Sequence, residues 1–484
     1  MPKIVREVHW NAGVPPVVPR ASCPRPPRRC PESEPPIRGR THNNFRPGEV
    51  AIKLLTDSEA AICEQATISC MKSVLTLVAL LILTSLASPQ ERPRPVTVPI
   101  TLDHNRIVID VYLSLPDGTT KRVRAWVDSG NSELTMSRRI ASLFGPVNCE
   151  AQVCSATPPS EVVIGGMKIA LSGIQSAHVP AGFPNDVMVP GMSPEINLPS
   201  TVLHTHDVVF DYTNREFTIG EPGTVQFKGK PSKAQINALG LIQIPSQIEG
   251  QSYDLALDLG SSISFISSEL LSKWHADHPA WPFMTGAVGV ANMFGTPEET
   301  ERFVLQLPSL PSGTNVLRQV SMASFPANLL EKFKQRAGTE IVGLLGGDAF
   351  RNYRVGIDYA RSTVYLDQAT NTPAWDVSAV GLTLRPEPDG RYTVLAVVAY
   401  QGKPAVAEVK PGDVLLGVDG APATGATLGQ VWSLLGGTPG QTRALTLERD
   451  GRRFTVDAPI HRFLAAPAKP SRTTRITQRP SQKK

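Results

Sequence analysis

The sequence predicts a mainly β protein with two homologous lobes, followed by a smaller C-terminal module that combines strands with one helix. Three observations carry this prediction: a repeated aspartate motif, a repeated hairpin pattern and a change of pattern after Trp375. The aspartate motif occurs in 124–137 and again in 254–267, where both copies read apolar-Asp-x-Gly-x-Ser around Asp128 and Asp258. Each copy predicts a buried strand, a tight turn that glycine permits, and a second strand.

The second repeat pairs 206–219 with 353–366, and each copy reads as strand, Asp-Tyr turn, strand. The acids of these turns, Asp211 and Asp358, are interpreted as turn formers. Together the two repeats define lobes at 97–222 and 230–368. A repeat of this size indicates duplication rather than a solenoid, whose periods are shorter.

The repeated aspartates are the candidate catalytic residues. If a pseudo-twofold axis relates the lobes, Asp128 and Asp258 lie side by side, and two close carboxyl groups share a proton and split their pKa values. One then acts as a general base on water and the other as an acid on the substrate carbonyl. Such chemistry needs no metal or other cofactor, and none is expected. The residues expected to support the turns are Ser129, Gly130, Gly260 and Ser261. The alternative is that both aspartates only stabilise turns in an inactive protein.

The segment 128–130, Asp-Ser-Gly, matches the Asp-Ser/Thr-Gly signature of the retropepsin and pepsin aspartic proteases. The segment 344–350, followed by 355–359, resembles the end of a pepsin-type second lobe. The chain thus resembles bacterial retropepsin-like proteins that fuse two such units and add a PDZ domain. That resemblance implies two β-barrel lobes, an aspartic endopeptidase activity and polypeptide substrates. The second motif departs from the family at Leu259, and the expected flap region, 158–182, has no tyrosine. These departures leave open a catalytically inactive envelope binding protein that acts through its cleft and its PDZ domain.

The C-terminal module spans 375–460. Its strand patterns, the segment Pro-Gly-Asp-Val-Leu…Val-Asp-Gly at 411–420 and a helix pattern at 427–435 that ends at Gly436 look like a bacterial PDZ domain. PDZ domains add an extended peptide to a sheet edge and hold its C-terminal carboxylate with backbone N–H groups. The resemblance implies that such peptide C-termini bind at Gly381, Leu382, Thr383, Leu384, Thr427 and Val431. The alternative is a PDZ-like fold that only packs on the lobes.

The two ends of the chain do not read as folded structure. Residues 71–87 resemble a secretory signal peptide, with Lys72, an apolar run and small residues before Ser88. The preceding 1–70 are interpreted as a non-native extension; the alternative is a cytoplasmic segment with an uncleaved anchor at 74–87. The basic tail, 461–484, is expected to be disordered. A periplasmic or secreted location follows, with no stable membrane insertion after signal cleavage.

Export changes the interpretation of the cysteines, because only Cys149 and Cys154 follow the signal segment. Five positions apart in an oxidising compartment, they are expected to form a disulfide; the alternative is two free thiols. The histidine pairs 204/206 and 275/278 lack a third ligand, so no metal site is expected. The net charge of +5 belongs to the two ends, and the body between them is mildly acidic. The sequence therefore predicts no nucleic-acid partner.

Overall fold

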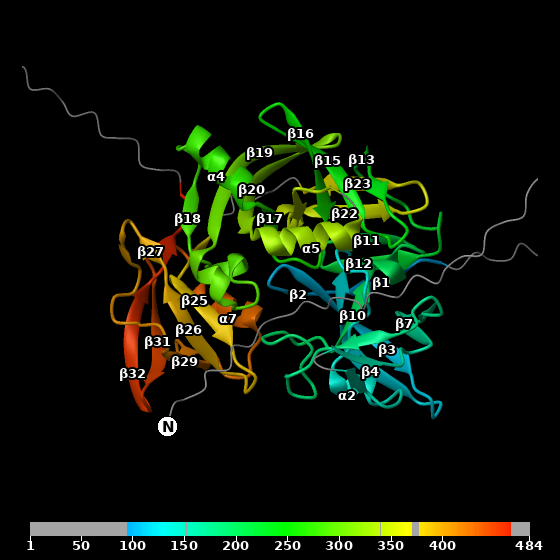
Figure 1. Cartoon of the computed structure of the whole chain (residues 1–484), viewed down its shortest axis with the longest axis horizontal. Coiled ribbons are helices and arrows are strands. Elements are labelled where there is room, and N and C mark those ends of the chain that lie inside the picture. The colour runs from blue at the N-terminus through cyan, green and yellow to red at the C-terminus, as the bar shows by residue number, and fades with distance from the viewer. Residues whose placement is uncertain (1–93, 151–152, 339, 370–376, 466–484) are drawn as a thin grey trace, which may run out of the picture. The chain divides into compact units, whose positions relative to one another are not determined.

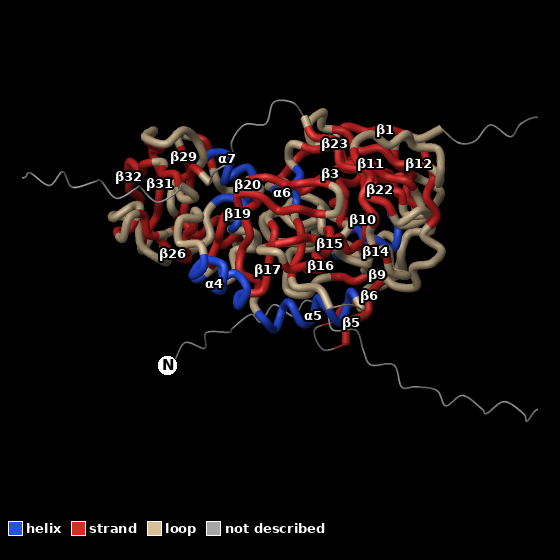
Figure 2. Tube along the Cα trace, turned by 90° about the horizontal axis from the view of Figure 1, so that it is seen from above, coloured by secondary structure: helices blue, strands red, loops and turns tan. Residues whose placement is uncertain are grey.

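The computed structural model describes residues 94–150, 153–338, 340–369 and 377–465 (Figure 1). The predicted N-terminal extension, the signal segment and most of the C-terminal tail lie outside these residues. Strands take up far more of the described trace than helices do, as Figure 2 shows. Among the described residues, no helix is both long enough and apolar enough to span a membrane.

A six-stranded sheet joins the two halves of the duplicated region. Its order is β1-β12-β11-β22-β23-β13, and β11 runs antiparallel to β22 with Phe210 opposite Val355. The two predicted Asp-Tyr hairpins are confirmed as β11/β12 and β22/β23, and they are the four inner strands of this sheet. The bounds of its strands are β1 Val96–Pro99, β11 Asp207–Asp211, β12 Glu216–Gly220, β13 Lys230–Lys233, β22 Tyr353–Asp358 and β23 Thr363–Gln368.

The first half builds a sheet of order β10-β4-β3-β7-β8, with β2 paired to β3. In β4 the buried residues Val123, Ala125 and Val127 alternate with Arg124 and Trp126, which are only partly buried, so one face of the strand enters the core. The bounds are β2 Thr101–Asp103, β3 Arg106–Ser114, β4 Thr120–Asp128, β7 Glu161–Ile164, β8 Met167–Ala170, β10 Ile196–Pro199, α2 Arg138–Ala141 and α3 Ser200–Leu203. A small separate sheet joins β5 Asn148–Glu150, β6 Val153–Ala156 and β9 Ala177–Val179.

The second half builds a sheet of order β14-β15-β16-β21-β17-β20-β19-β18. The predicted strand–turn–strand around Asp258 is confirmed as β16 and β17, and β16 pairs parallel with β21 as β4 does with β10. The bounds are β14 Gln235–Ile236, β15 Ile242–Ile248, β16 Gln251–Leu257, β17 Ser264–Ser267, β18 Phe283–Thr285, β19 Phe303–Ser312, β20 Asn315–Phe325, β21 Gly343–Leu345, α4 Ser268–Asp277, α5 Ala327–Ala337, α6 Gly347–Phe350 and the 3-10 turns η1 Gly289–Ala291 and η2 Pro297–Glu301.

The C-terminal module is a sheet of order β25-β26-β29-β31-β32 with one helix, α7. The expected helix is confirmed: Thr427 is its N-cap, and it ends before Gly436. The bounds are β24 Ser378–Ala379, β25 Leu382–Pro386, β26 Tyr392–Val397, β27 Ala399–Tyr400, β28 Lys403–Pro404, β29 Val414–Val418, β30 Ala421–Pro422, α7 Leu428–Leu435, β31 Thr442–Arg449, β32 Arg452–Pro459 and β33 His461–Arg462.

The C-terminal boundary needs a correction, because the predicted disordered tail began at His461. His461 and Arg462 form β33, which pairs with β24, and the following Phe463 and Leu464 are buried. Two apolar side chains after a polar pair give too short a pattern to predict a strand from sequence. The module therefore continues to Leu464.

The hydrophobic core falls into two clusters. One fills the region of the two repeats, from Ile100 to Leu366. The other contains the core of the C-terminal module together with second-half residues such as Phe265, Met284, Val288 and Ala291. The module and residues of 230–368 therefore share one core cluster; from the sequence, packing on this part of the chain is expected only as an alternative to peptide binding.

Candidate active site

Asp128 and Asp258 occupy equivalent places in the two halves. Asp128 is the last residue of β4, and Asp258 directly follows β16. Each of these strands is held by a parallel partner: Pro199 lies opposite Asp128, and Asp258 donates its backbone N–H to the Leu345 carbonyl over 2.9 Å. In each half, the backbone then turns at a glycine two residues after the aspartate.

The two turns meet, as the sequence predicted. A side-chain carbon added at Gly130 would collide with the Asp258 carboxyl group, and one added at Gly260 would collide with the Asp128 carboxyl group. Each glycine thus lies directly against the aspartate of the opposite turn. This reciprocal packing is what a pseudo-twofold relation between the turns would produce, and it places each carboxyl group against the opposite turn.

Ser129 ties the first turn to the second. Its hydroxyl accepts a hydrogen bond from the Leu259 backbone N–H at 3.0 Å and donates one to the Leu257 carbonyl at 3.3 Å. Leu259 occupies the matching position of the second turn and is fully buried in the apolar core. The cross-link is therefore made from one side only, and packing of Leu259 takes the place of a second hydroxyl.

The second turn also holds its own aspartate. Asp258 Oδ1 accepts hydrogen bonds from the backbone N–H groups of Gly260 and Ser261, at 3.0 and 3.1 Å. The Ser261 hydroxyl donates to the Ile263 carbonyl at 2.7 Å, so it braces the turn rather than facing the carboxyl groups. Gly260 and Ser261 thus both hold this turn through hydrogen bonds.

Burial and mutual repulsion set the protonation of the pair. Asp128 is 3% exposed, and Asp258 is partly buried. Burial raises the pKa of Asp128 well above its usual 3.8, and the negative charge of Asp258 raises it further; hydrogen bonds involving Asn197, Gly130 and Asn131 oppose the rise. The pair therefore retains a proton at pH values where an isolated carboxyl group has lost it.

Sequence reasoning missed a buried arginine close to this pair. Arg106 is 1% exposed; burial lowers its pKa to about 10, while the charges of Asp103, Glu299, Asp128 and Asp258 act in the opposite direction. Its guanidinium donates to the Met293 carbonyl at 2.8 Å. An arginine at the start of an apolar strand reads like a surface residue, so the sequence held no signal for this position.

Sequence reasoning also missed a buried carboxyl group, that of Asp348. Asp348 in α6 accepts a hydrogen bond from Ser264 at 2.8 Å, and burial raises its pKa to about 7. Burial also raises the pKa of the Tyr212 hydroxyl, and the charges of Asp258 and Asp348 raise it further. The resemblance covered this segment, but it gave Asp348 no role.

The expected flap region contains the β7/β8 hairpin. A carbon added at Gly165, in its turn, would lie within 3.3 Å of Val96 and Val98 of β1. The tip therefore packs on the six-stranded sheet. Cys149 of β5 and Cys154 of β6 form the expected disulfide, with Cα atoms 4.0 Å apart.

The residues expected to bind peptides contact several other parts of the same chain. Thr383 donates its hydroxyl to the Ala287 carbonyl at 3.0 Å, and the Leu384 N–H donates to Asn292 Oδ1 at 2.9 Å. Leu382 and Val431 are fully buried, and a carbon added at Gly381 would meet Ala405 and Phe463. Thr427 caps α7 and also donates to Asp103 at 2.9 Å.

Comparison with known proteins finds likeness only among solved structures. No family model matches the chain, and no curated protein matches it. Among solved structures, the chain is similar to an aspartic proteinase from Irpex lacteus, at 14% identity, over 58% of this chain and 99% of that one, with a TM-score of 0.35. At this distance the likeness assigns neither substrate nor site, so the geometry of the two turns carries the interpretation.

Proposed function

We propose that this chain is an exported aspartic endopeptidase in which Asp128 and Asp258 form the catalytic pair. The observation that carries the proposal is the reciprocal packing of Gly130 on Asp258 and of Gly260 on Asp128. Carboxyl groups brought together in this way, one of them with a strongly raised pKa, form a pair able to share a single proton.

The proposed reaction is hydrolysis of a peptide bond. The ionised carboxylate takes a proton from water while the oxygen of that water bonds to the substrate carbonyl carbon, and the protonated carboxyl group gives its proton to the carbonyl oxygen. The resulting gem-diol then collapses: the C–N bond breaks, the nitrogen takes a proton from the carboxyl group that had accepted one, and a hydroxyl proton of the gem-diol returns to the other carboxylate. An acid and an amine leave, and the pair regains its starting state.

Export to the periplasm or the medium is part of the proposal. It is supported by the signal-like segment 71–87 and by the Cys149–Cys154 disulfide, since disulfides persist mainly in oxidising compartments. The PDZ-like order of motifs in the C-terminal module supports a role in binding extended peptides or C-terminal tails.

A second candidate function is a non-catalytic binding protein on the same scaffold. Two observations favour it: Leu259 supplies no hydroxyl to the interface between the turns, and Asp128 is almost fully covered. In that case the module and the cleft carry the function, and no variant of the aspartates changes peptide turnover.

Cleavage of a mixed peptide library by the full chain, from acid to neutral pH, separates the two candidates. Asp128→Asn and Asp258→Asn serve as variants of nearly identical shape. Cleavage that disappears in both variants supports the protease. No cleavage by the folded wild type at any pH supports the binding protein, and cleavage that survives both substitutions rules out the aspartate pair.

A further inference from the structure

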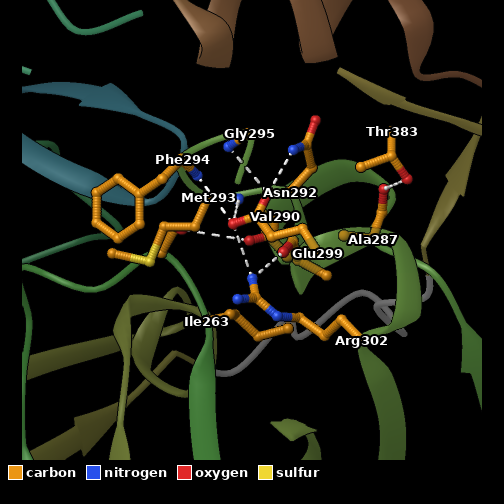
Figure 3. Close-up of polar contacts among 12 residues, drawn as sticks. Ile263, Ala287, Val290, Asn292, Met293, Phe294, Gly295, Glu299, Arg302 and Thr383 are labelled. Atoms are coloured by element: carbon orange, nitrogen blue, oxygen red, sulfur yellow. Dashed lines mark hydrogen bonds and ion pairs between the residues drawn. The ribbon is translucent and has the colours of Figure 1, made fainter. Parts of the chain in front are cut away.

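The edge of β25 is the place where a peptide would add to the C-terminal module, and it is already occupied. β25 pairs with β26 on one side only, so its other side is the outer edge of the sheet. Along that edge runs a segment of the second lobe, residues 287–295, which we name the inner segment. Figure 3 shows its polar contacts, including the bond from Thr383 to Ala287.

Asn292 imitates a paired strand. Its Oδ1 accepts the Leu384 N–H at 2.9 Å, and its Nδ2 donates to the Leu384 carbonyl, also at 2.9 Å. These are the two bonds that the backbone of an added strand would make with one residue. The same Oδ1 accepts a hydrogen bond from the Trp432 indole of α7 at 3.2 Å, so Asn292 contacts both the strand and the helix.

Apolar residues of the inner segment complete the match. Val288 and Ala291 are fully buried and belong to the same core cluster as Leu382, Leu384 and Val431. The inner segment therefore offers β25 and α7 both elements of strand addition, edge hydrogen bonds and side chains for a groove.

The shape of the inner segment is set from within the second lobe. The fully buried Glu299 carboxylate accepts the N–H groups of Met293, Phe294 and Gly295, at 3.1, 3.0 and 3.0 Å. Arg302 contacts the same carboxylate at 2.9 Å, and Figure 3 shows these bonds converging. Asn292 Nδ2 also donates to Glu299 Oε2 at 2.6 Å, so moving Asn292 away from β25 disturbs the carboxylate that holds the N–H groups of 293–295.

The inner segment also reaches the turn that carries Asp258. Ser262 donates its hydroxyl to the Val290 carbonyl at 3.2 Å, and the Ser261 hydroxyl lies 3.6 Å from the sulfur of Met293. From the first lobe, His104 Nε2 lies 2.8 Å from the Gly289 carbonyl, and Arg106 donates to the Met293 carbonyl. One short segment thus touches β25, α7, the Asp258 turn and the first lobe.

We propose that residues 287–295 are an internal ligand of the C-terminal module, and that an extended polypeptide pairing with β25 must displace them and so loosen the turn of Asp258. This rests on the proposed peptide-binding role of the module. Peptide binding to the module and the conformation of the Asp258 turn are then coupled, because both depend on the position of the inner segment.

The first test measures competition in the full chain. The probe is a fluorescent synthetic peptide with the sequence of residues 286–296, titrated with wild type, Asn292→Ala and Glu298→Ala. Glu298 is an exposed residue of the same loop, so its variant is the matched control. Without Asn292 the inner segment holds β25 less tightly, and we expect at least tenfold tighter probe binding in Asn292→Ala than in the other two. Equal affinity of all three folded proteins would overturn the proposal.

The second test needs no variant, so a folding defect in Asn292→Ala does not affect it. Amide hydrogen exchange of the wild-type full chain is measured with and without an excess of the same peptide, carrying heavy isotopes to separate it by mass. We expect faster exchange at 293–295 and unchanged protection of β25. Unchanged exchange at 293–295 while the probe is bound would place the peptide elsewhere and overturn the proposal.

Neither readout depends on hydrolysis, so the two proposals can fail separately. Displacement of the inner segment without cleavage of any peptide would support the displacement proposal and contradict the protease proposal. Cleavage by the aspartate pair without displacement would support the protease proposal and contradict the displacement proposal.

Discussion

At the scale of single residues, Gly130 and Gly260 do what no other residue type can do at these positions. Each lies against the carboxyl group of the opposite turn, with no room for a side-chain carbon. The two aspartates can therefore lie close together only because neither glycine carries a side chain.

We expect Gly130→Ala and Gly260→Ala each to lower the free energy of unfolding by about 1–3 kcal/mol, the usual cost of forcing an extra carbon into a packed site. Urea denaturation measures the change. Gly173→Ala is the matched control, since a carbon there meets open space, and it should stay within about 0.5 kcal/mol of the wild type. Three variants of equal stability would show that the turns do not touch.

The raised pKa of Asp128 makes stability depend on pH in a defined direction. Between its usual pKa of 3.8 and the raised folded value, the folded protein binds a proton that the unfolded chain has released. Stability contributed by this group is therefore full below pH 4 and falls as pH rises, by about 1.4 kcal/mol for each pH unit across that window.

Asp128→Asn removes this dependence without changing the shape of the side chain. We expect the variant to gain stability relative to the wild type as pH rises from 4 to 7, measured by chemical denaturation at several pH values. A difference that stays constant over this range would mean that Asp128 titrates normally in the folded protein.

At the scale of elements, the N-terminus of α7 connects the module to the first lobe through hydrogen bonds. Thr427 and Gln430 form a capping box, and Thr427 also donates to the Asp103 carboxylate. The Leu428 N–H donates to the Gly191 carbonyl over 2.7 Å. One helix end thus uses both its cap and its free N–H group to hold the first lobe.

Thr427→Ala should lower the free energy of unfolding by more than the roughly 1 kcal/mol typical of a lost cap, because the bond to Asp103 goes with it. Thr427→Ser keeps the hydroxyl and should recover most of the loss. Hydrogen exchange of α7 locates the effect. Equal stability of the Ala and Ser variants would show that the Thr427 hydroxyl does not stabilise this contact.

Local pattern predicted the elements well where one side of them is buried or a turn residue is diagnostic. The Asp-Tyr hairpins, the strands around both aspartates and α7 all follow from apolar spacing, glycine and a cap. The pairing of β11 with β22 did not, because nothing in either hairpin specifies a partner more than a hundred residues away. The inner segment also escaped notice, since its buried Asn292, and the buried Glu299 that holds it, look like loop residues in the sequence.

At the scale of the whole molecule, the C-terminal module does not have a hydrophobic core of its own. Its core cluster includes Val288, Ala291 and Met293 of the second lobe. The sequence placed a domain boundary near Trp375 because the motif pattern changes there, but a change of pattern along the chain does not show whether two cores are continuous.

A chain that ends at Ala369 should therefore be less stable than the full chain, because the second lobe would expose this apolar surface to water. We expect a lower midpoint of thermal unfolding and increased binding of a hydrophobic dye. The full-length protein measured beside it is the control. A truncated chain with the same midpoint and no dye binding would show that the shared core adds nothing to the lobes.

The most direct test of the central claim is the pH dependence of kcat/KM for one cleaved peptide, measured for wild type and for Asp258→Asn. A pair sharing one proton predicts a bell-shaped profile, which falls at low pH as both carboxyl groups become protonated and at high pH as the shared proton leaves. Asp258→Asn should reduce kcat/KM by about 10²-fold or more at the optimum. A rate that rises steadily into alkaline pH, or that survives in Asp258→Asn, would contradict the account.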